Sequence, residues 1–351
     1  MAHAAVACLA AAMVFLGIMA AGATAAGMNS DMMWIDSATA KPDTYAAFRG
    51  PFELAADGEI ELRTLASSWY VVWLDGQYVE EGPTRFEVKH PQYQSRRFKL
   101  AAGTHVLAVQ LHHIGAETRM LLDMPPFLYC NVTSGGSEIP VQWKCSRLPG
   151  YRPQVRRINP QLGWIEWCDT RQNPQEWQSP GFDDGKWPQP VPANTKLEQI
   201  APVTIGPVQY LTHPGKVIAQ GKLAEVFGYE FDDVPARFLL RDLVCDKLPP
   251  QGVWRRYDLG RVRLARPRFV LDLPEGAVIE FAYSESLSDG RVSPYITLST
   301  GQSCNLDHYV ARGGPQEFFP LTPKGGRFVE VHVFADAEKV RFVKEEFVER
   351  T

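Results

Sequence analysis

The sequence predicts an all-β protein built from two consecutive antiparallel β-sandwich domains. Short apolar runs alternate with turn residues along most of the chain, as expected for strands joined by tight turns. No segment after the first 26 residues shows the apolar period of an amphipathic helix. The chain has 351 residues, including 27 prolines and 28 glycines. This length suits about two domains rich in turns.

The first 26 residues are predicted to form a signal peptide. An uncharged, apolar run from Ala4 to Ala21 is followed by small residues, and Ala25 or Ala26 fits a cleavage site. The alternative is an N-terminal membrane anchor, because the run approaches the roughly 20 residues that a span needs. Export predicts a secreted or periplasmic protein that has no membrane contact after signal cleavage.

The first domain is predicted over residues 27–210. Trp69 to Leu74 is continuously apolar, as in a strand buried on both faces. Asp75-Gly76 supplies a tight hairpin turn into the returning strand Gln77 to Glu80. Within Val106 to His113, Leu107 and its alternate neighbours share one apolar face. Further short strands are expected at Phe86–Val88 and Phe98–Leu100. Together these runs favour a jelly roll.

The second domain is predicted over residues 211–351, where regular strand signals resume. Pro274-Glu275-Gly276 and Asp289-Gly290 mark turns between apolar runs. The expected strands are Phe238–Val244, Trp254–Leu259, Arg268–Leu273, Val278–Tyr283, Asp307–Val310, Phe328–Phe334 and Val340–Val348. This run of antiparallel strands predicts a second sandwich.

Charge and cysteine usage exclude several classes of site. The net charge is −4 with acids and bases interspersed, which argues against nucleic-acid binding and against a polybasic membrane patch. No CxxC pair supports a zinc site. His112 and His113 are adjacent on a strand and point to opposite faces, so no metal is predicted there. In an exported protein, Cys130, Cys145 and Cys168 allow either one disulfide or buried thiols.

The order of motifs in the second half carries a resemblance to a known family. Tyr257-Asp258-Leu259-Gly260 is followed by Asp307-His308-Tyr309, by Gly313-Gly314 with Glu317, and by a strand from Gly325 to Val331. This order resembles the concanavalin-like β-sandwich of bacterial α-L-rhamnosidases, glycoside hydrolase family 78. The resemblance covers roughly residues 250–335. The sequence departs from the family at Arg327-Phe328, where phenylalanine, arginine and then tyrosine are usual.

The first half resembles the same family in two segments. Gly163 to Arg171 is similar to the family's "glutamate-x-x-aspartate-alanine-arginine" segment, and Gly181 to Trp187 follows at a suitable distance. The resemblance implies a jelly-roll domain similar to galactose-binding modules. Aromatic rings cover the apolar faces of sugars, while charged groups fix the hydroxyls. The candidate carbohydrate-binding residues are Glu166, Asp169, Arg171 and Trp177. The alternative is that these residues are structural.

Catalysis is not expected from this chain alone. The family places its catalytic carboxyl groups on an (α/α)₆ barrel that follows the sandwiches, and we expect that barrel to begin after Val348. We therefore predict no catalytic residue and no metal or other cofactor. Calcium is possible but is not supported by the sequence. Family members with a calcium-assisted rhamnose site tend to carry acidic or amide residues before the tryptophan that Trp143 matches, and this chain has Pro140-Val141-Gln142 there.

Three functional interpretations remain open. The chain is a non-catalytic portion of a rhamnosidase that works with a separate catalytic barrel, a free-standing exported carbohydrate-binding protein, or a scaffold protein. In the first two interpretations its partner is a carbohydrate, with L-rhamnose-containing glycans implied by the resemblance.

Overall fold

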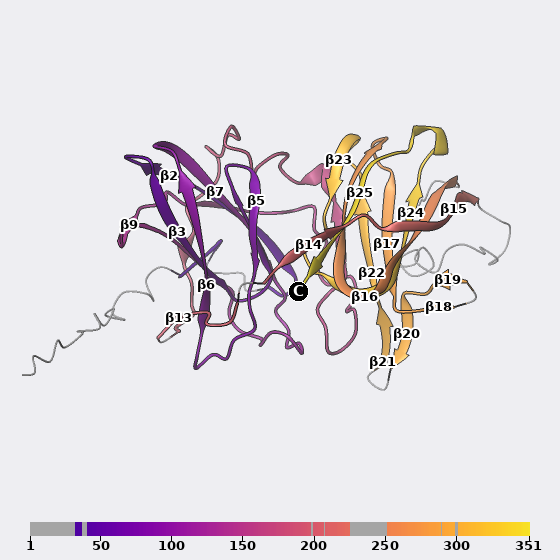
Figure 1. Cartoon of the computed structure of the whole chain (residues 1–351), viewed down its shortest axis with the longest axis horizontal. Helices are drawn as coiled ribbons and strands as arrows, with labels where there is room; N and C mark the ends of the chain where they lie inside the picture. The colour runs from indigo at the N-terminus through magenta and orange to yellow at the C-terminus, as the bar shows by residue number, and fades with distance from the viewer. Residues whose placement is uncertain are drawn as a thin grey trace, which may run out of the picture.

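The computed structural model describes residues 32–36, 41–197, 199–206, 208–224, 251–288, 290–298 and 301–351. In these ranges the regular elements are β-strands and two short 3₁₀ turns, which confirms the all-β prediction. Figure 1 shows them as two lobes, with the C-terminus at the junction. No helix in these ranges is long and apolar enough to cross a membrane. The signal peptide, the strand Phe238–Val244 and Cys245 lie outside the described residues.

Two sheets form the first sandwich. The strand order in one is β12-β1-β8-β3-β6-β13, with β9 added to β8, and in the other it is β10-β2-β7-β4-β5. The strands of the first sheet are β1 (Met32–Trp34), β3 (Gly58–Ala66), β6 (Gln92–Leu100), β8 (Leu128–Ser134), β9 (Ser137–Ile139), β12 (Val191–Pro192) and β13 (Ala201–Pro202). Those of the second are β2 (Thr44–Leu54), β4 (Tyr70–Leu74), β5 (Gln77–Gly82), β7 (Gly103–His113) and β10 (Lys144–Arg147).

The core of the first sandwich follows the predicted alternation. Leu107, Val109 and Leu111 of β7 are fully buried in one apolar cluster between the sheets. The Asp75-Gly76 turn has the positive φ angles of a tight hairpin, 50° and 78°. The strand predicted at Phe86–Val88 is wrong, because this exposed segment forms only an isolated bridge between Glu87 and His90.

The second sandwich is organised around one long strand, β16 (Gln251–Leu273). β16 pairs with β15 through its first half and with β25 and β23 through its second half. It pairs with β24 from Gly252 to Ala265, with a register shift between Asp258 and Arg263. The other strands are β11 (Glu166–Asp169), β14 (Tyr210–His213), β15 (Lys216–Ala224), β17 (Val278–Ser284), β22 (Leu306–Val310), β23 (Gly314–Phe318), β24 (Lys324–Phe334) and β25 (Arg341–Arg350). Small elements complete it: β18 (Leu287–Ser288), β19 (Arg291–Val292), β20 (Tyr295–Leu298), β21 (Gly301–Cys304) and the 3₁₀ turns η2 (Thr170–Gln172) and η3 (Ala337–Lys339).

An aromatic cluster fills the second sandwich. Phe269 lies edge-on against Tyr257, Phe281 and Phe347, with ring centroids 5.3–5.6 Å apart. Such edge-to-face packing is favourable for aromatic rings and adds to the gain from burying their area. The register shift of β16 brings Tyr257 and Phe269 from the two halves of one strand into the same core.

Strand β11 connects the two sandwiches. It pairs in parallel with β22 of the second sandwich, with Glu166 opposite Asp307, although its residues fall within the predicted limits of the first domain. The chain then returns to the first sandwich at β12 and β13, and it crosses again at β14, which pairs with β25. The domain limits 27–210 and 211–351 therefore stay a prediction, and hydrogen bonding does not follow them at β11.

The cysteines within the described ranges are free thiols. Cys130, Cys145, Cys168 and Cys304 are all buried. Of the two alternatives left open by the sequence, buried thiols describe Cys130, Cys145 and Cys168, and no bridge joins them. Burial raises the pKa of each thiol, so these groups are unreactive at neutral pH.

Candidate functional site

A cleft of about 360 Å³ lies between the two sandwiches. Its walls come from β4, β5 and β7 of the first sandwich, from β16, β22 and β23 of the second, and from the connecting loop at 173–179. Ligand sites for small molecules have volumes of about 300–1,000 Å³ and occur preferentially at domain interfaces. The cleft meets both conditions.

Aromatic rings from both sandwiches line this cleft. Tyr78 of β5 meets Phe319 edge-on, with ring centroids 6.0 Å apart. Trp73 of β4 meets Trp177 of the connecting loop in the same way at 5.7 Å. Trp73, Tyr78 and Phe319 are half-buried, so part of each ring is accessible to a ligand. Such rings can cover the apolar C–H face of a sugar.

Polar side chains of both signs surround the rings. Gln77, Glu176 and Glu317 are exposed at the cleft. Arg268 donates from Nε to Glu317 Oε2 at 2.8 Å, and the two side chains are 34% and 43% exposed. Arg312 adds a second cation to the lining. This balance of charge suits a neutral ligand with many hydroxyl groups better than a strongly charged one.

Arg49 holds one wall of the cleft in place. Its side chain is buried, and Nη2 donates to the carbonyl oxygens of Ser179 and Pro180 at 2.8 and 2.7 Å. Asp184 lies 3.4 Å from Nη1 and balances the charge. The 179–184 loop is thereby fixed to β2, next to Trp177. Arg49 was not among the predicted site residues. The sequence could have indicated it, because a single arginine in the apolar run of β2 is expected to be buried with polar partners.

Glu166, the first predicted site residue, is buried behind the cleft. Its Oε1 accepts from the Tyr309 hydroxyl at 2.6 Å, and its Oε2 accepts from the Leu321 N–H at 2.8 Å. The Glu166 N–H donates to Asp307 Oδ1 at 3.2 Å. Burial and the neighbouring Asp307 raise the pKa of the Glu166 carboxyl. The residue fastens β11 to β22 and presents no oxygen to a ligand in the cleft.

Asp307 is also buried inside the second sandwich. Lys324 Nζ donates to its Oδ1 at 2.5 Å, and the Tyr283 hydroxyl donates to its Oδ2 at 2.8 Å. Asp307 and Tyr309, which alternate on β22, thus have a structural role within the sandwich.

Asp169 and Arg171 form a local ion pair. Arg171 donates from Nε and Nη2 to the two carboxylate oxygens of Asp169, both at 2.8 Å. Asp169 also accepts from the Arg171 N–H and begins the 3₁₀ turn η2. These hydrogen bonds lower the pKa of Asp169. Asp169 is buried, whereas the Arg171 side chain is 42% exposed, so only Arg171 of this pair is open to solvent.

Trp177 lines the cleft but is only 3% exposed. It packs between Trp73 and Trp187, with the Trp187 ring centroid 6.1 Å away. The structure thus brings Glu166, Asp169 and Arg171 together on β11 and η2, and it places Trp177 separately in the cleft wall. The carbohydrate site assigned to these four residues stays a prediction. Glu166, Asp169 and Trp177 are buried and support the fold around the cleft, whereas Arg171 is exposed but is not among the residues that line the cleft.

The accessible residues of the cleft were not predicted from the sequence. Tyr78 was interpreted only as part of a returning strand, and Phe319 was not singled out. Arg268 and Glu317 lie on strands that are far apart in the sequence and that pair with each other, β16 with β23. The packing of one sandwich against the other then brings Tyr78 to these three side chains.

No metal centre emerges from the described residues. Within those ranges, no group of three or more histidine, cysteine, aspartate or glutamate side chains could hold a metal ion. His112 and His113 face opposite sides of β7, as the sequence predicts. His112 stacks on Tyr45 and contacts Asp43 at 2.8 Å, whereas His113 lies against Trp34.

Comparison with known proteins agrees with the resemblance seen in the second half. Residues 253–349 match the model of the bacterial alpha-L-rhamnosidase concanavalin-like domain, which confirms that expectation. No curated protein sequence matches the chain.

Solved rhamnosidase structures share the fold. The GH78 family rhamnosidase of Bacillus sp. GL1 has a TM-score of 0.73 at 14% identity, over 92% of this chain and 55% of that one. The Streptomyces avermitilis alpha-L-rhamnosidase complexed with L-rhamnose has a TM-score of 0.60 at 18% identity, over 88% and 28%. The Aspergillus terreus alpha-L-rhamnosidase has a TM-score of 0.57 at 18% identity, over 90% and 36%. The chain therefore spans about half or less of these enzymes and matches a non-catalytic β-sandwich region.

Proposed function

We propose that this rhamnosidase-like β-sandwich region acts in carbohydrate recognition and binds rhamnoside-containing glycans in the cleft between its sandwiches. One observation carries the proposal: accessible aromatic rings from both sandwiches meet in a single cleft whose polar lining has mixed charge. One of the similar structures is a rhamnosidase in complex with L-rhamnose, and this choice of sugar is transferred here as part of the proposal.

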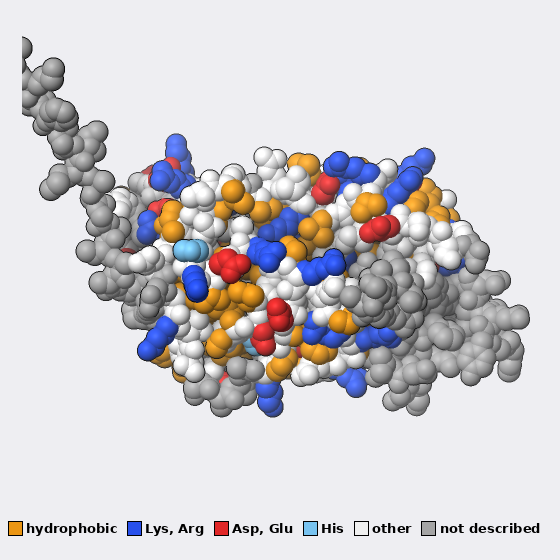
Figure 2. Space-filling model, turned by 90° about the horizontal axis from the view of Figure 1, so that it is seen from below, with side chains coloured by type: hydrophobic (Ala, Val, Ile, Leu, Met, Phe, Trp, Pro, Cys, Tyr) orange, Lys and Arg blue, Asp and Glu red, His pale blue; other side chains and the backbone are white. Residues whose placement is uncertain are grey.

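The cleft supplies the two kinds of contact that sugar binding needs. Tyr78 and Phe319 offer ring surface to an apolar C–H face, which the methyl group of a rhamnoside extends. Arg268 donates and Glu317 accepts, so together they can hold neighbouring hydroxyl groups. The face of the molecule seen in Figure 2 shows acidic and basic side chains scattered among apolar ones.

A calorimetric titration with a rhamnose-containing oligosaccharide tests the proposal. The full chain is expected to bind saturably, and the double variant Arg268→Ala, Glu317→Ala is expected to bind about tenfold more weakly, a loss of about 1.4 kcal/mol. Removing both members of the exposed pair leaves no unpaired charge, so the fold is retained.

The matched control is the double variant Asp258→Ala, Arg327→Ala. This pair is a second ion pair of the same sandwich, with the Arg327 side chain 42% exposed, and neither residue lines the cleft. The control is expected to bind like the parent chain. Absence of binding at about 10 mM sugar, which covers millimolar affinities, or equal affinity of the cleft variant, would contradict the proposal.

A second candidate function is support of a separate glycosidase barrel. Large apolar side chains are exposed on strands of the second sandwich. Exposed apolar surface of this kind favours contact with a partner domain. Among the described residues they include Leu211, Val217, Ile218, Val262, Leu264 and Val343. Charged replacements of Val262 and Val343 are expected to abolish co-purification with a rhamnosidase barrel domain and to leave sugar binding unchanged. Co-purification that persists would remove this candidate.

We further propose that the chain is exported and cleaved near Ala25 or Ala26, on the evidence of the apolar leader. N-terminal sequencing of the protein recovered from the periplasm or medium is expected to start within two residues of Gly27. An intact Met1 in a membrane fraction would favour the anchor instead.

A further inference from the structure

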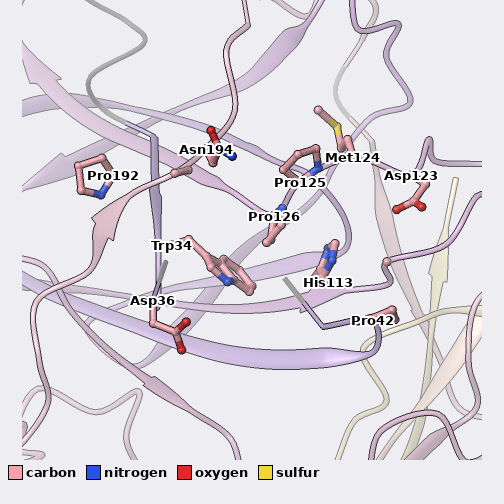
Figure 3. Close-up of a pocket in the computed structure, with 12 residues that line it drawn as sticks. Trp34, Asp36, Pro42, His113, Asp123, Met124, Pro125, Pro126, Pro192 and Asn194 are labelled. Carbon is pink, nitrogen blue, oxygen red and sulfur yellow. The ribbon is translucent and has the colours of Figure 1, made fainter. Parts of the chain in front are cut away.

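A second concave site lies within the first sandwich, apart from the cleft. This pocket has a volume of about 460 Å³ and shares no lining residue with the cleft. Trp34 at the end of β1 and His113 at the end of β7 lie side by side in it, facing Pro126 (Figure 3). Proline rings supply most of the remaining apolar lining, and Asn194 adds an exposed amide.

Two buried nitrogen atoms in this lining lack partners. Trp34 and His113 are each only 3% exposed, and neither Trp34 Nε1 nor His113 Nδ1 has a hydrogen-bond partner in the described part of the chain. Burial, together with His112, lowers the pKa of His113 to about 4, so its ring is neutral at pH 7. Buried polar atoms are usually satisfied, and a ligand hydroxyl can satisfy either nitrogen once its ring turns slightly towards the pocket.

The charges at the rim select against anions. Figure 3 shows Asp36 and Asp123 at opposite ends of the pocket. Arg147 pairs with Asp36 from outside at 3.7 Å, but no lysine or arginine is among the described residues that line the pocket. Carboxylates accept hydrogen bonds from hydroxyl groups and repel a ligand that carries a carboxylate or phosphate.

An organic cation fits this pocket less well than a neutral polyol. Cages for ammonium groups surround the charge with several accessible aromatic faces, whereas Trp34 is the one aromatic side chain here besides His113, and it is nearly covered. Aspartate, asparagine and histidine around an apolar floor are instead suited to many hydroxyl groups.

We propose that the first sandwich holds a second carbohydrate site, in which the pocket of Trp34, His113, Asp123 and Asn194 binds a neutral saccharide residue and rejects acidic sugars. The site is independent of the cleft. A chain with both sites would hold one glycan at two points, or two glycans at once.

The test uses the full chain with the cleft variant Arg268→Ala, Glu317→Ala as background, so that binding in the cleft is weakened about tenfold relative to binding in the pocket. The probes are two matched pairs, D-galactose with D-galacturonate and D-glucose with D-glucuronate, and L-rhamnose, each titrated to about 10 mM. Within each pair only the group at C6 changes, from a neutral hydroxymethyl to a carboxylate. At least one neutral sugar is expected to bind, and at least fivefold more tightly than its acidic partner.

Adding Asp123→Ala and Asn194→Ala to that background removes two exposed side chains and is expected to weaken the neutral sugar about tenfold. Circular dichroism and the thermal midpoint check that the fold is intact. The proposal is overturned if no neutral sugar binds, if the acidic partners bind equally well, or if the added substitutions change nothing. If the cleft proposal alone fails, the background variant binds like the parent chain and the pocket result still stands.

Discussion

In both sandwiches, the central strands are buried on the face that packs into the apolar core and also on the opposite face. The side chains on that opposite face differ between the two sandwiches. On β7, the face opposite the core meets an aromatic cluster that includes Trp69 and Trp177. Its polar members are Gln110, which bonds the neutral Tyr151 hydroxyl at 2.9 Å, and His112, which contacts the buried Asp43 at 2.8 Å. On β17, β22 and β24, the corresponding positions carry ionisable groups that are 1% exposed or less. These are Glu280, His308, Glu330 and His332.

The charged layer is held together by pairing across strands. Arg256 donates to Glu330 at 2.7 Å, His332 contacts the same carboxylate at 2.7 Å, and Arg291 is a third partner. His308 contacts Glu280 at 3.2 Å and stacks on Trp167. Buried charges cost free energy unless they are paired. This face has several such groups on three strands and therefore depends on its partners more than the face of β7, where His112 is the ionisable side chain and is paired with Asp43.

The largest effect is expected from Glu330→Ala. The substitution leaves Arg256 and Arg291 without their shared carboxylate in a buried position, at a cost of about 3–5 kcal/mol in the free energy of unfolding. Gln110→Ala on the first sandwich removes a neutral hydrogen bond and should cost about 1 kcal/mol. Urea denaturation of both variants measures the difference, and equal costs would break the comparison.

A second difference is expected in the dependence of stability on pH. In the first sandwich, burial raises the pKa of Glu80 to about 7. In the second, burial alone would raise the pKa of Glu330, but His332 and Arg291 lower it to about 2. The folded state therefore favours the protonated form of Glu80 and the ionised form of Glu330.

The two carboxyl groups should act in opposite directions. The contribution of Glu80 to the free energy of unfolding is present below about pH 4.5 and is lost as pH rises towards 7. The contribution of Glu330 is present above about pH 4.5 and is lost as pH falls towards 2. Each amounts to about 3 kcal/mol. Glu80→Gln is expected to reduce the pH dependence between 4.5 and 7, where Glu166 also contributes, and Glu330→Gln is expected to reduce that below 4.5. Unfolding curves across this range that shift in parallel for both variants would contradict the assignment.

The smallest effect is expected at the surface of the second sandwich. Arg327 binds Asp258 at 2.8 and 2.9 Å, but its side chain is 42% exposed. Arg327→Ala should therefore change the free energy of unfolding by less than about 1 kcal/mol. Thermal denaturation would show whether the cost approaches that of Glu330→Ala, in which case burial would not be what separates the two ion pairs.

The sequence predicted the core-facing side of the strands better than the opposite side. Alternation in Val106 to His113 correctly indicated which side chains of that strand form the core, and the strand at Val278 to Tyr283 was also correctly predicted. The sequence could not show that polar side chains between the apolar ones are also buried. Glu280 and His332 alternate with apolar residues, as side chains on a solvent-exposed face do, yet both are buried. Alternation of apolar and polar residues in a strand identifies the face that packs into the core, but it does not show whether the polar face is exposed or buried.

The candidate site shows the same limit. Glu166, Asp169 and Arg171 lie close together in sequence and in space, and a local motif was enough to group them. Tyr78 and Phe319 are brought together only by the packing of one sandwich on the other. The parallel pairing of β11 with β22 joins the two lobes. It involves the four residues of β11 and the buried Glu166 carboxyl group, and no local sequence pattern predicts this pairing.

A crystal structure of the chain soaked with a rhamnose-containing oligosaccharide tests the central claim most directly. We predict a sugar ring in the cleft between the sandwiches, against Tyr78 or Phe319 and within hydrogen-bond distance of Arg268 or Glu317. A well-defined sugar bound elsewhere on the chain, with the cleft empty at a concentration that saturates binding in solution, would contradict it.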